Sequence, residues 1–235
     1  MRWHIQGLGS LGCLWAARFA AAQQPVRLIL RNPAALARYQ KIGRVRLSDA
    51  NQQHTQSYRI SAQLPTHHEP ISRLLLACKA YDATAAIAQV AHRLDQDSLV
   101  VLLQNGLGSQ QAVQALIPNT RCIVASSTEG AYLTEPFHSV FAGQGEIWLG
   151  SLERHPEPEG LINNCRDAQI PCTWTATIET TLWRKLAINC LINPLTVIHD
   201  CSNGALIAHA DLINTLCTEL HALLIAAQHP AAAED

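Results

Sequence analysis

Hydrophobic and polar positions follow two different patterns along the chain. Up to about Ile178, short apolar or β-branched runs alternate with segments of helical periodicity, which is typical of a parallel sheet covered by helices. After that residue the strand patterns stop and two long helical patterns follow. We therefore expect an α/β fold, in which a doubly wound sheet over residues 1–177 is followed by the start of an all-α domain over residues 178–235.

The individual elements can be predicted from the same pattern. Strands are expected at Arg2–Gln6, Val26–Leu30, Arg73–Cys78, Ser98–Leu103, Cys122–Ser126, Glu146–Gly150 and Pro171–Thr175. Helices are expected at Leu11–Ala22, Pro33–Gln40, Ala83–Leu94, Ser109–Leu116, Glu179–Ile198 and Leu212–Ala227, with one more after the turn at residues 155–158. Between them, Gly43–Ser61 alternates polar and apolar positions and fits either a strand pair or an irregular excursion.

A G-x-G-x-x-G motif at Gly7, Gly9 and Gly12 stands between the first predicted strand and the first predicted helix. The first glycine permits a tight turn, the second lets the backbone approach a pyrophosphate, and the third lets helix and strand pack closely. Helix N–H groups favour the anion at this point. The motif predicts a Rossmann-like, dinucleotide-binding domain, and the alternative is a glycine-rich turn without a ligand.

The end of the second predicted strand bears on the choice of dinucleotide. Rossmann folds that bind NAD usually carry Asp or Glu about 20 residues after the glycines, where it holds the ribose 2′-hydroxyl. Here that place is taken by Arg31, whose guanidinium would pair with a 2′-phosphate. The sequence thus predicts NADP(H), and the alternative is a solvated arginine at a strand end. Lys79 and Asn105 follow two further predicted strands at the same ligand-binding edge, although Asn105-Gly106 is also a common turn pair.

Composition and charge exclude several classes of protein. Hydrophobic residues make up 48% of the chain and charged residues 15%, which fits a folded globular protein. The net charge of -1, from 17 basic and 18 acidic residues, gives no field that would gather nucleic acid or anionic lipid. No apolar stretch reaches the ~18 residues of a membrane span, and polar residues interrupt the N-terminal apolar run, which argues against a signal peptide.

The eight cysteines show neither C-x-x-C nor another zinc-type spacing. We therefore expect reduced, mostly buried thiols, no metal site and a cytoplasmic location.

A second group of polar residues stands in the segment Trp183–Thr196. Lys185, Asn189 and Asn193 recur every four residues and so share one helical face. A solvated stripe on a surface helix is the simplest interpretation. However, these residues differ from the usual Glu/Lys mixture of exposed helices, and Pro194 frees the carbonyl of Cys190 nearby. The pattern therefore predicts a site rich in hydrogen-bond donors.

These motifs together resemble one enzyme family. The glycine loop, Lys79, the run Asn105–Gly108, and above all Trp183–Thr196 followed by Cys201–Gly204, are similar to the 2-dehydropantoate 2-reductase (ketopantoate reductase) family along residues 1 to about 235. The resemblance implies reduction of 2-dehydropantoate to pantoate with NADPH, on the route to pantothenate and coenzyme A.

The resemblance also implies roles for single residues. Lys185 is the implied proton donor, because an ammonium group can stabilise the negative charge that hydride transfer builds on the ketone oxygen and then protonate it. A lysine titrates ordinarily near 10.4, so we expect it to be partly buried. Substrate contacts are implied for Asn105, Asn189, Asn193 and Asn203. Cofactor contacts are implied for Gly7, Leu8, Gly9, Ser10, Leu11, Gly12, Lys79, Asn105 and Ala131.

One departure from the family and three alternatives remain. Family members continue with further helices that supply a serine and a glutamate to the site, so we expect a truncated form with slow turnover. We also expect it to self-associate through the apolar face of Leu212, Leu216, Leu220, Leu223 and Leu224.

Three alternative functions remain. The first is an enzyme that acts on another small 2-oxo acid or on a β-hydroxyacid, and the second is a non-catalytic NADP-binding module. The third is a methyltransferase, which would normally carry an acid where Arg31 stands.

Overall fold

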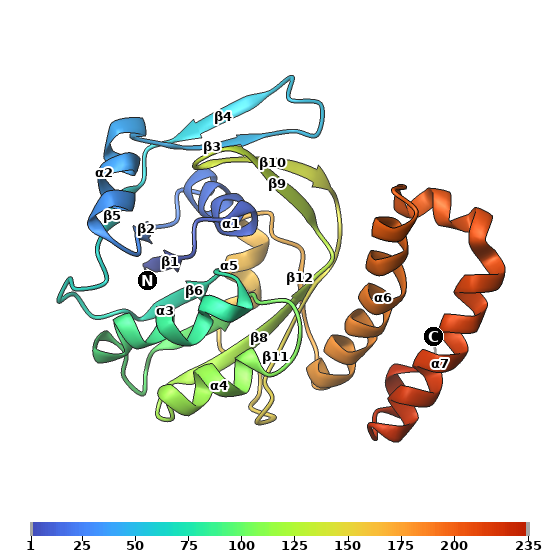
Figure 1. Ribbon diagram of the computed structural model, residues 1–235. Helices are drawn as coiled ribbons and strands as arrows, with labels where there is room; N and C mark the ends of the chain where they lie inside the picture. The colour runs from blue at the N-terminus through green and yellow to red at the C-terminus, as the bar shows by residue number, and fades with distance from the viewer. Residues whose placement is uncertain (1, 234–235) are drawn as a thin grey trace. The chain divides into compact units, whose positions relative to one another are not determined.

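The computed structural model describes residues 2–233, and the chain divides into two compact units, Met1–Ala176 and Thr177–Asp235. Met1, Glu234 and Asp235, at the outer ends of the two expected domains, lie outside the described residues. Figure 1 shows the first unit in blue through gold and the second in orange and red.

Within residues 2–233, the first unit contains an eight-stranded sheet in the order β12-β11-β8-β7-β6-β1-β2-β5. These strands are β1 (Trp3–Gln6), β2 (Val26–Ile29), β5 (Ser61–Gln63), β6 (Arg73–Leu76), β7 (Leu99–Leu102), β8 (Arg121–Ser127), β11 (Ile147–Gly150) and β12 (Cys172–Trp174). All neighbours pair in parallel except β8 and β11, which are antiparallel. The order from β5 to β8 is that of doubly wound nucleotide-binding sheets, and it reverses between β1 and β6. The predicted α/β fold class is confirmed.

The central strands are buried along their whole length. Every residue of β1, β6 and β7 is buried, as is usual where helices cover both faces of a parallel sheet. The register places Ile5 beside Leu28 on one side and Leu75 on the other. This burial explains why β7 and the last three residues of β6 form continuous apolar runs in the sequence, whereas β1 also buries the polar residues His4 and Gln6.

Helices of the first unit connect these strands. They are α1 (Ser10–Ala21), α2 (Pro33–Ile42), α3 (Ala83–Val90), α4 (Ser109–Leu116) and α5 (Leu161–Asp167), with short 3-10 turns η1 (Ala80–Asp82) and η2 (Ala91–Arg93). The start of α2 is fixed locally, because Asn32 Oδ1 accepts a hydrogen bond from the Ala35 backbone N–H at 2.8 Å and Pro33 follows the cap. Helices α3 and α4 pack against each other (Figure 1).

A second sheet, of four strands, packs on the other side of α1. Its order is β4 (Thr55–Tyr58), β3 (Val45–Ser48), β10 (His138–Gly143) and β9 (Gly130–Glu135). Segment Gly43–Ser61 thus forms the strand pair that was one of its two predicted alternatives, whereas β5 and the β9–β10 hairpin were not predicted. Helix α1 contacts β3, β9 and β10 as well as β1 and β2, so it is covered by both sheets.

Aromatic side chains fill the core beneath α1. Trp3 stacks on Phe19 with ring centroids 4.8 Å apart, and Trp15 meets the same ring edge-on at 5.9 Å. All three side chains are fully buried. Their packing fixes α1, and with it the glycine loop that precedes the helix, against the sheet.

The second unit is helical throughout its described residues, 177–233. It contains α6 (Ile178–Ile198), η3 (Asn203–His209), α7 (Ala210–Ala226) and η4 (Pro230–Ala232). Pro194 lies inside α6 without ending it. Trp183 of α6 stacks on His229 at 4.3 Å between ring centroids, which ties the end of the chain back to the first helix of the unit.

Two features bear on the composition-based expectations. No helix among residues 2–233 is both long and apolar enough to cross a membrane. All eight cysteines, which lie in the described part, are free, but only Cys13, Cys122 and Cys165 are buried, and Cys190 and Cys217 are exposed. The expectation that the thiols are mostly buried is therefore wrong, since the helices of the second unit leave two of them in contact with solvent.

Candidate cofactor site and the polar helix face

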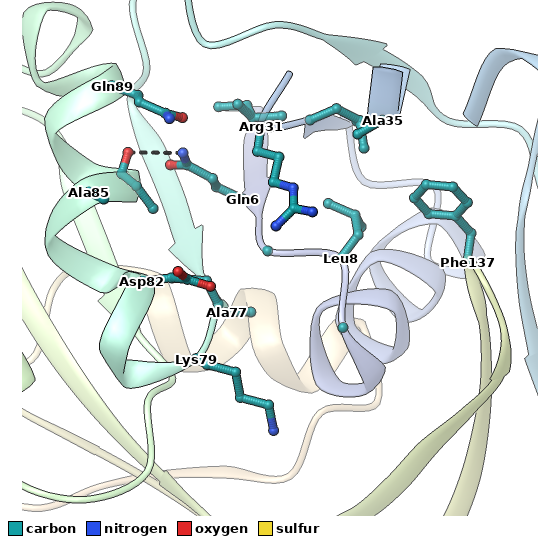
Figure 2. Close-up of a pocket in the computed structure, with 16 residues that line it drawn as sticks. Gln6, Leu8, Arg31, Ala35, Ala77, Lys79, Asp82, Ala85, Gln89 and Phe137 are labelled. Atoms are coloured by element: carbon teal, nitrogen blue, oxygen red, sulfur yellow. Dashed lines mark hydrogen bonds between the residues drawn. The ribbon is translucent and has the colours of Figure 1, made fainter. Parts of the chain in front are cut away.

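A cavity of about 370 Å³ lies at the carboxyl ends of β1, β2 and β6, where the strand order reverses. In doubly wound sheets this is the place where ligands bind. Its lining comes from the glycine loop, the end of β2, the loop after β6, and α3, and includes Gln6, Gly7, Leu8, Gly9, Arg31, Lys79, Asp82, Ala85, Ala86, Gln89 and Phe137. Figure 2 shows the Arg31 guanidinium in the middle of these residues, with Gln6, Asp82 and Lys79 on the side of α3 and Leu8 and Phe137 on the other side.

The three glycines of the loop differ in what surrounds them. Gly7 has a φ of +97°, and a Cβ there would lie 2.6 Å from the Ala77 carbonyl carbon and overlap Cys78. A Cβ on Gly12 would overlap the carbonyl oxygen of Gly7. Around Gly9, by contrast, a Cβ would meet nothing within 4 Å. Gly7 and Gly12 are thus required by the fold itself, whereas at Gly9 the open backbone faces space that a ligand can enter.

The N-terminus of α1 suits an anion. Gly9 is the N-cap, no side chain within the described residues caps the first N–H groups, and the first turn contains no acidic residue. The unpaired N–H groups and the helix dipole favour negative charge at this end. Ser10, Leu11 and Gly12 form this first turn and are not part of the cavity lining, and the Ser10 carbonyl accepts a hydrogen bond from Ser139 Oγ at 3.0 Å.

A second cavity of about 560 Å³ adjoins the first, since the two share Leu8, Arg31, Ala35 and Phe137. It brings Arg38 of α2 to the same place as Arg31. Both arginines are exposed and neither forms an ion pair within residues 2–233. Glu135 also lines this cavity, but its carboxylate pairs with Arg46. The end of β2 is therefore cationic, and Arg38 was not predicted to lie here because a single arginine in a helix carries no signal by itself.

Two other predicted cofactor contacts lie outside the cavity. Ala131 belongs to β9, where it pairs with Phe141 of β10 in the small sheet. Asn105 is exposed in the loop after β7, and Gly106 and Gly108 on either side of Leu107 both have positive φ, at 87° and 93°. The structure thus brings Gly7, Leu8, Gly9, Arg31 and Lys79 together, and it does not bring Asn105 or Ala131 to them.

Among the cavity residues that were not predicted from the sequence as site residues are the polar residues Gln6, Asp82 and Gln89. Gln6 is the last residue of β1, and Asp82 and Gln89 come from η1 and α3. The signal for Gln6 was its polarity in a strand that is otherwise mostly apolar and fully buried, directly before the first glycine. Asp82 and Gln89 carry no comparable signal, since polar residues are ordinary in the first and last turns of a helix.

In the second unit, α6 carries the predicted polar face. Lys185 and Asn189 are partly buried and Asn193 is exposed, while Asn203 is exposed at the start of η3. Burial lowers the pKa of the Lys185 ammonium below its ordinary value, because the charged form is less well solvated. This shift is in the direction that makes a lysine a better acid near neutral pH.

Comparisons with known proteins agree with this geometry. The family model described as ketopantoate reductase PanE/ApbA matches residues 3–154, and the model of its C-terminal part matches residues 177–235. The 2-dehydropantoate 2-reductase of Vibrio cholerae is 29% identical over 94% of this chain and 72% of its own length. That of Halobacterium salinarum is 31% identical, over 88% and 68%. A crystal structure of a PanE/ApbA family ketopantoate reductase from Ralstonia eutropha has a TM-score of 0.83 at 23% identity and covers 97% of this chain and 75% of its own.

The Rossmann-like sheet, its glycine loop and these similarities define an NAD(P)-dependent oxidoreductase. Because the family model covers more than half of the chain, the chain belongs to the ketopantoate reductase PanE/ApbA family.

Proposed function

We propose that this protein reduces 2-dehydropantoate to pantoate with NADPH, by hydride transfer with Lys185 as the proton donor. The observation that carries the proposal is the meeting of the glycine loop and Arg31 in one cavity at the reversal of the strand order, in a chain of this family.

The cavity fits the adenosine half of a dinucleotide. The open backbone at Gly9 and the uncapped start of α1 would hold the pyrophosphate. Arg31, at the end of β2, would face the ribose and pair with a 2′-phosphate, and Arg38 adds a second positive charge within the adjoining cavity. From the resemblance, Ser10, Leu11, Gly12, Lys79, Asn105 and Ala131 complete the proposed cofactor contacts. The reduced nicotinamide supplies the hydride to the ketone carbon.

The polar face of the second unit would carry the substrate and the proton. As the carbonyl carbon gains the hydride, its oxygen becomes an alkoxide, and Lys185 donates the proton that converts this oxygen to the hydroxyl of pantoate. Asn105, Asn189, Asn193 and Asn203 are the proposed partners of the substrate carboxylate and hydroxyl groups. Amide groups can hold both without adding a charge of their own.

Self-association is a further part of the proposal. Of the predicted apolar face of α7, Leu223 and Leu212 are 63% and 40% exposed, Leu216 and Leu220 are partly buried, and Leu224 is buried, so its exposure was wrongly expected. Ile225, beside it, is 52% exposed. Apolar groups left in water favour a partner, and a second copy of the chain supplies one. Light scattering over a range of concentrations tests this, with Leu223→Glu as the variant that should remain monomeric.

The proposed reaction is tested by following NADPH oxidation with 2-dehydropantoate and detecting pantoate as the product. A panel of other small 2-oxo acids at the same concentration provides the comparison. Consumption that is fastest with 2-dehydropantoate supports the proposal. Faster turnover of another 2-oxo acid would show that the substrate is misassigned, and NADPH binding without turnover of any of them would identify a nucleotide-binding module instead.

A further inference from the structure

The loop that carries Asn105 is built around two glycines. It follows β7, and Gly106 and Gly108 have φ values of 87° and 93°, in the left-handed region that glycine adopts without strain. A Cβ on either glycine would meet no atom within 4 Å beyond its chain neighbours. Packing around these glycines therefore does not confine the backbone, and a fixed direction for the Asn105 side chain requires that another group holds the loop.

The side chain of Gln110 contacts this loop. Gln110 lies in the first turn of α4 and is 1% exposed. Its Nε2 donates hydrogen bonds to the backbone carbonyls of Gln104, at 3.3 Å, and of Gly106, at 3.0 Å. A side-chain amide has two N–H groups, one for each of these carbonyls. Because the two carbonyls belong to the residues on either side of Asn105, one side chain holds the backbone before and after it.

The amide of Gln110 can be oriented in one way only. If it were turned over, its oxygen would face two carbonyl oxygens, and none of the three would have a hydrogen to share. A side chain of similar length cannot replace it, since the carboxylate of Glu only accepts hydrogen bonds and the thioether of Met has no donor. The two N–H groups of a glutamine are therefore what the loop requires at this position.

Gln104, where the loop begins, is held in a similar way. It is 2% exposed, and its own Nε2 donates to the carbonyl of Leu76, the last residue of β6, at 2.7 Å. The same Nε2 also donates to the carbonyl of Cys78, which directly precedes Lys79, at 3.4 Å. Gln104 thus fixes the start of the loop on the neighbouring strand, and Gln110 fixes the loop on Gln104. Two buried amides thereby join the loops that follow β6 and β7.

We propose that Gln110 is a positioning residue, whose amide holds the backbone on both sides of Asn105 and so fixes the direction of the Asn105 side chain. This inference rests on the proposed function, in which Asn105 contacts the cofactor and the substrate. Gln110 acts through Asn105 and is not required to touch either of them. A displacement of about 1 Å can cost about 100-fold in rate, so a loosely held loop should weaken these contacts even when the fold is unchanged.

The test is a double-mutant cycle of Gln110→Met and Asn105→Ala. The quantities measured for each protein are kcat/KM for 2-dehydropantoate and the dissociation constant of NADPH. Gln110→Met keeps the length of the side chain and removes both N–H donors. We expect it to lower kcat/KM about 10- to 100-fold when Asn105 is present, and by less than about twofold when Asn105 is already alanine, because no side chain is then left to direct. A residue that only stabilises the fold would cost the same in both backgrounds.

Gln111→Met is a matched control. Gln111 stands next to Gln110 in the first half of α4, but it is exposed. The chemical change is the same, so this variant should keep the kcat/KM and the NADPH affinity of the unaltered protein. Hydrogen exchange of residues 104–108, followed by mass spectrometry, should be faster in Gln110→Met than in the control, and this measurement does not depend on turnover. If Gln110→Met fails to fold, Gln110→Asn, which withdraws the amide by one methylene group, replaces it in the cycle.

The outcomes separate the role of Gln110 from the function on which it rests. A loss that occurs only when Asn105 is present, together with faster exchange of the loop, supports the role. An equal loss in both backgrounds, no loss, or unchanged exchange overturns it and leaves the proposed reaction intact. If Asn105→Ala turns over 2-dehydropantoate and binds NADPH as the unaltered protein does, Asn105 is not a contact, and the role of Gln110 is wrong as well. If the unaltered protein turns over no 2-oxo acid, the proposed reaction is wrong, and the same cycle in NADPH affinity decides the role of Gln110.

Discussion

Replacing Gly9 or Gly12 by alanine should separate cofactor binding from folding, although the two residues lie in one motif. At Gly9 the backbone has φ −77° and ψ −166°, which alanine adopts without strain, and the added Cβ meets no atom within 4 Å. At Gly12 the Cβ would overlap the Gly7 carbonyl oxygen and lie 3.1 Å from its carbon. The methyl group at Gly9 therefore enters open space, whereas the one at Gly12 enters the contact between α1 and the glycine loop that precedes it.

The expected magnitudes differ accordingly. Overpacking of this kind costs about 1–3 kcal/mol, and because the atoms in the way belong to the backbone, we place Gly12→Ala at about 3 kcal/mol. For a unit of this size that corresponds to a fall in melting temperature of roughly 6–12 °C. Gly9→Ala should change the free energy of unfolding by no more than about 1 kcal/mol, and in the stabilising direction, because alanine restricts the unfolded chain. The new methyl group should instead weaken NADPH binding about 10- to 100-fold, since it keeps the phosphates from the backbone N–H groups.

Two measurements on each variant check this reasoning: thermal unfolding without cofactor, and NADPH titration by fluorescence well below the unfolding temperature. We expect Gly9→Ala to unfold at or slightly above the temperature of the unaltered protein and to bind weakly. Gly12→Ala should unfold at a clearly lower temperature. If Gly9→Ala binds NADPH as the unaltered protein does, the open face at Gly9 is not where the pyrophosphate lies. If Gly12→Ala is as stable as the parent, the close approach of α1 to Gly7 is not required by the fold.

Three further substitutions test the charges of the molecule. Arg31→Ala should reduce the preference for NADPH over NADH about 10- to 100-fold, as measured by titrating both cofactors, because it removes a charge-assisted contact to the 2′-phosphate; equal affinities in the unaltered protein would contradict the assignment. Lys185→Ala should lower kcat by about 10²–10⁴ with little change in NADPH affinity. In the parent, kcat should fall as pH rises through the pKa of Lys185, which burial places below its ordinary value. Unchanged turnover in the Lys185 variant would show that this residue is a solvated surface residue and not the proton donor. Burial, with nearby Arg93, lowers the pKa of His4 to about 4. Between pH 6.5 and 4 the imidazole is therefore protonated only in the unfolded chain, and the free energy of unfolding should fall by up to about 3 kcal/mol as the pH drops. His4→Gln should lose this dependence in urea unfolding at pH 5 and pH 7.5, and an unchanged dependence would show that other groups cause it.

The parts of the fold that could be predicted are those in which burial requires a regular pattern of apolar residues in the sequence. Strand β7 and the last three residues of β6 are continuous apolar runs because helices cover both faces of these strands. Strand β9 could not be predicted in this way, since four of its six residues are exposed and no alternation remains. The antiparallel direction of β11 was also beyond prediction, because a buried strand has the same composition whichever way it runs.

The same distinction applies to the residues of the candidate site, since only those next to a predictable strand could be found from the sequence. Gly7, Gly9 and Arg31 could be found because each follows a legible strand at a spacing that the nucleotide-binding fold requires. Phe137 could not, because it belongs to the turn of the unpredicted β9–β10 hairpin and reaches the cavity only through the pairing of β10 with β3. Arg38 was missed for a related reason, since only the folded structure shows that α2 brings it beside Arg31.

The small sheet has a further consequence for the cofactor cavity. Phe137 has a positive φ of 62°, which a bulky residue adopts only where its surroundings hold it. Its ring packs edge-on against Tyr39 at 5.0 Å, and the Tyr39 hydroxyl donates to the Ile60 carbonyl at 2.7 Å. Ile60 lies two residues after the end of β4, so the β3–β4 strand pair and the β9–β10 hairpin together fix the wall that Phe137 forms beside Leu8 and Arg31. The cavity floor therefore comes from the doubly wound sheet, whereas the wall nearest the proposed 2′-phosphate position comes from segments that carry little pattern of their own.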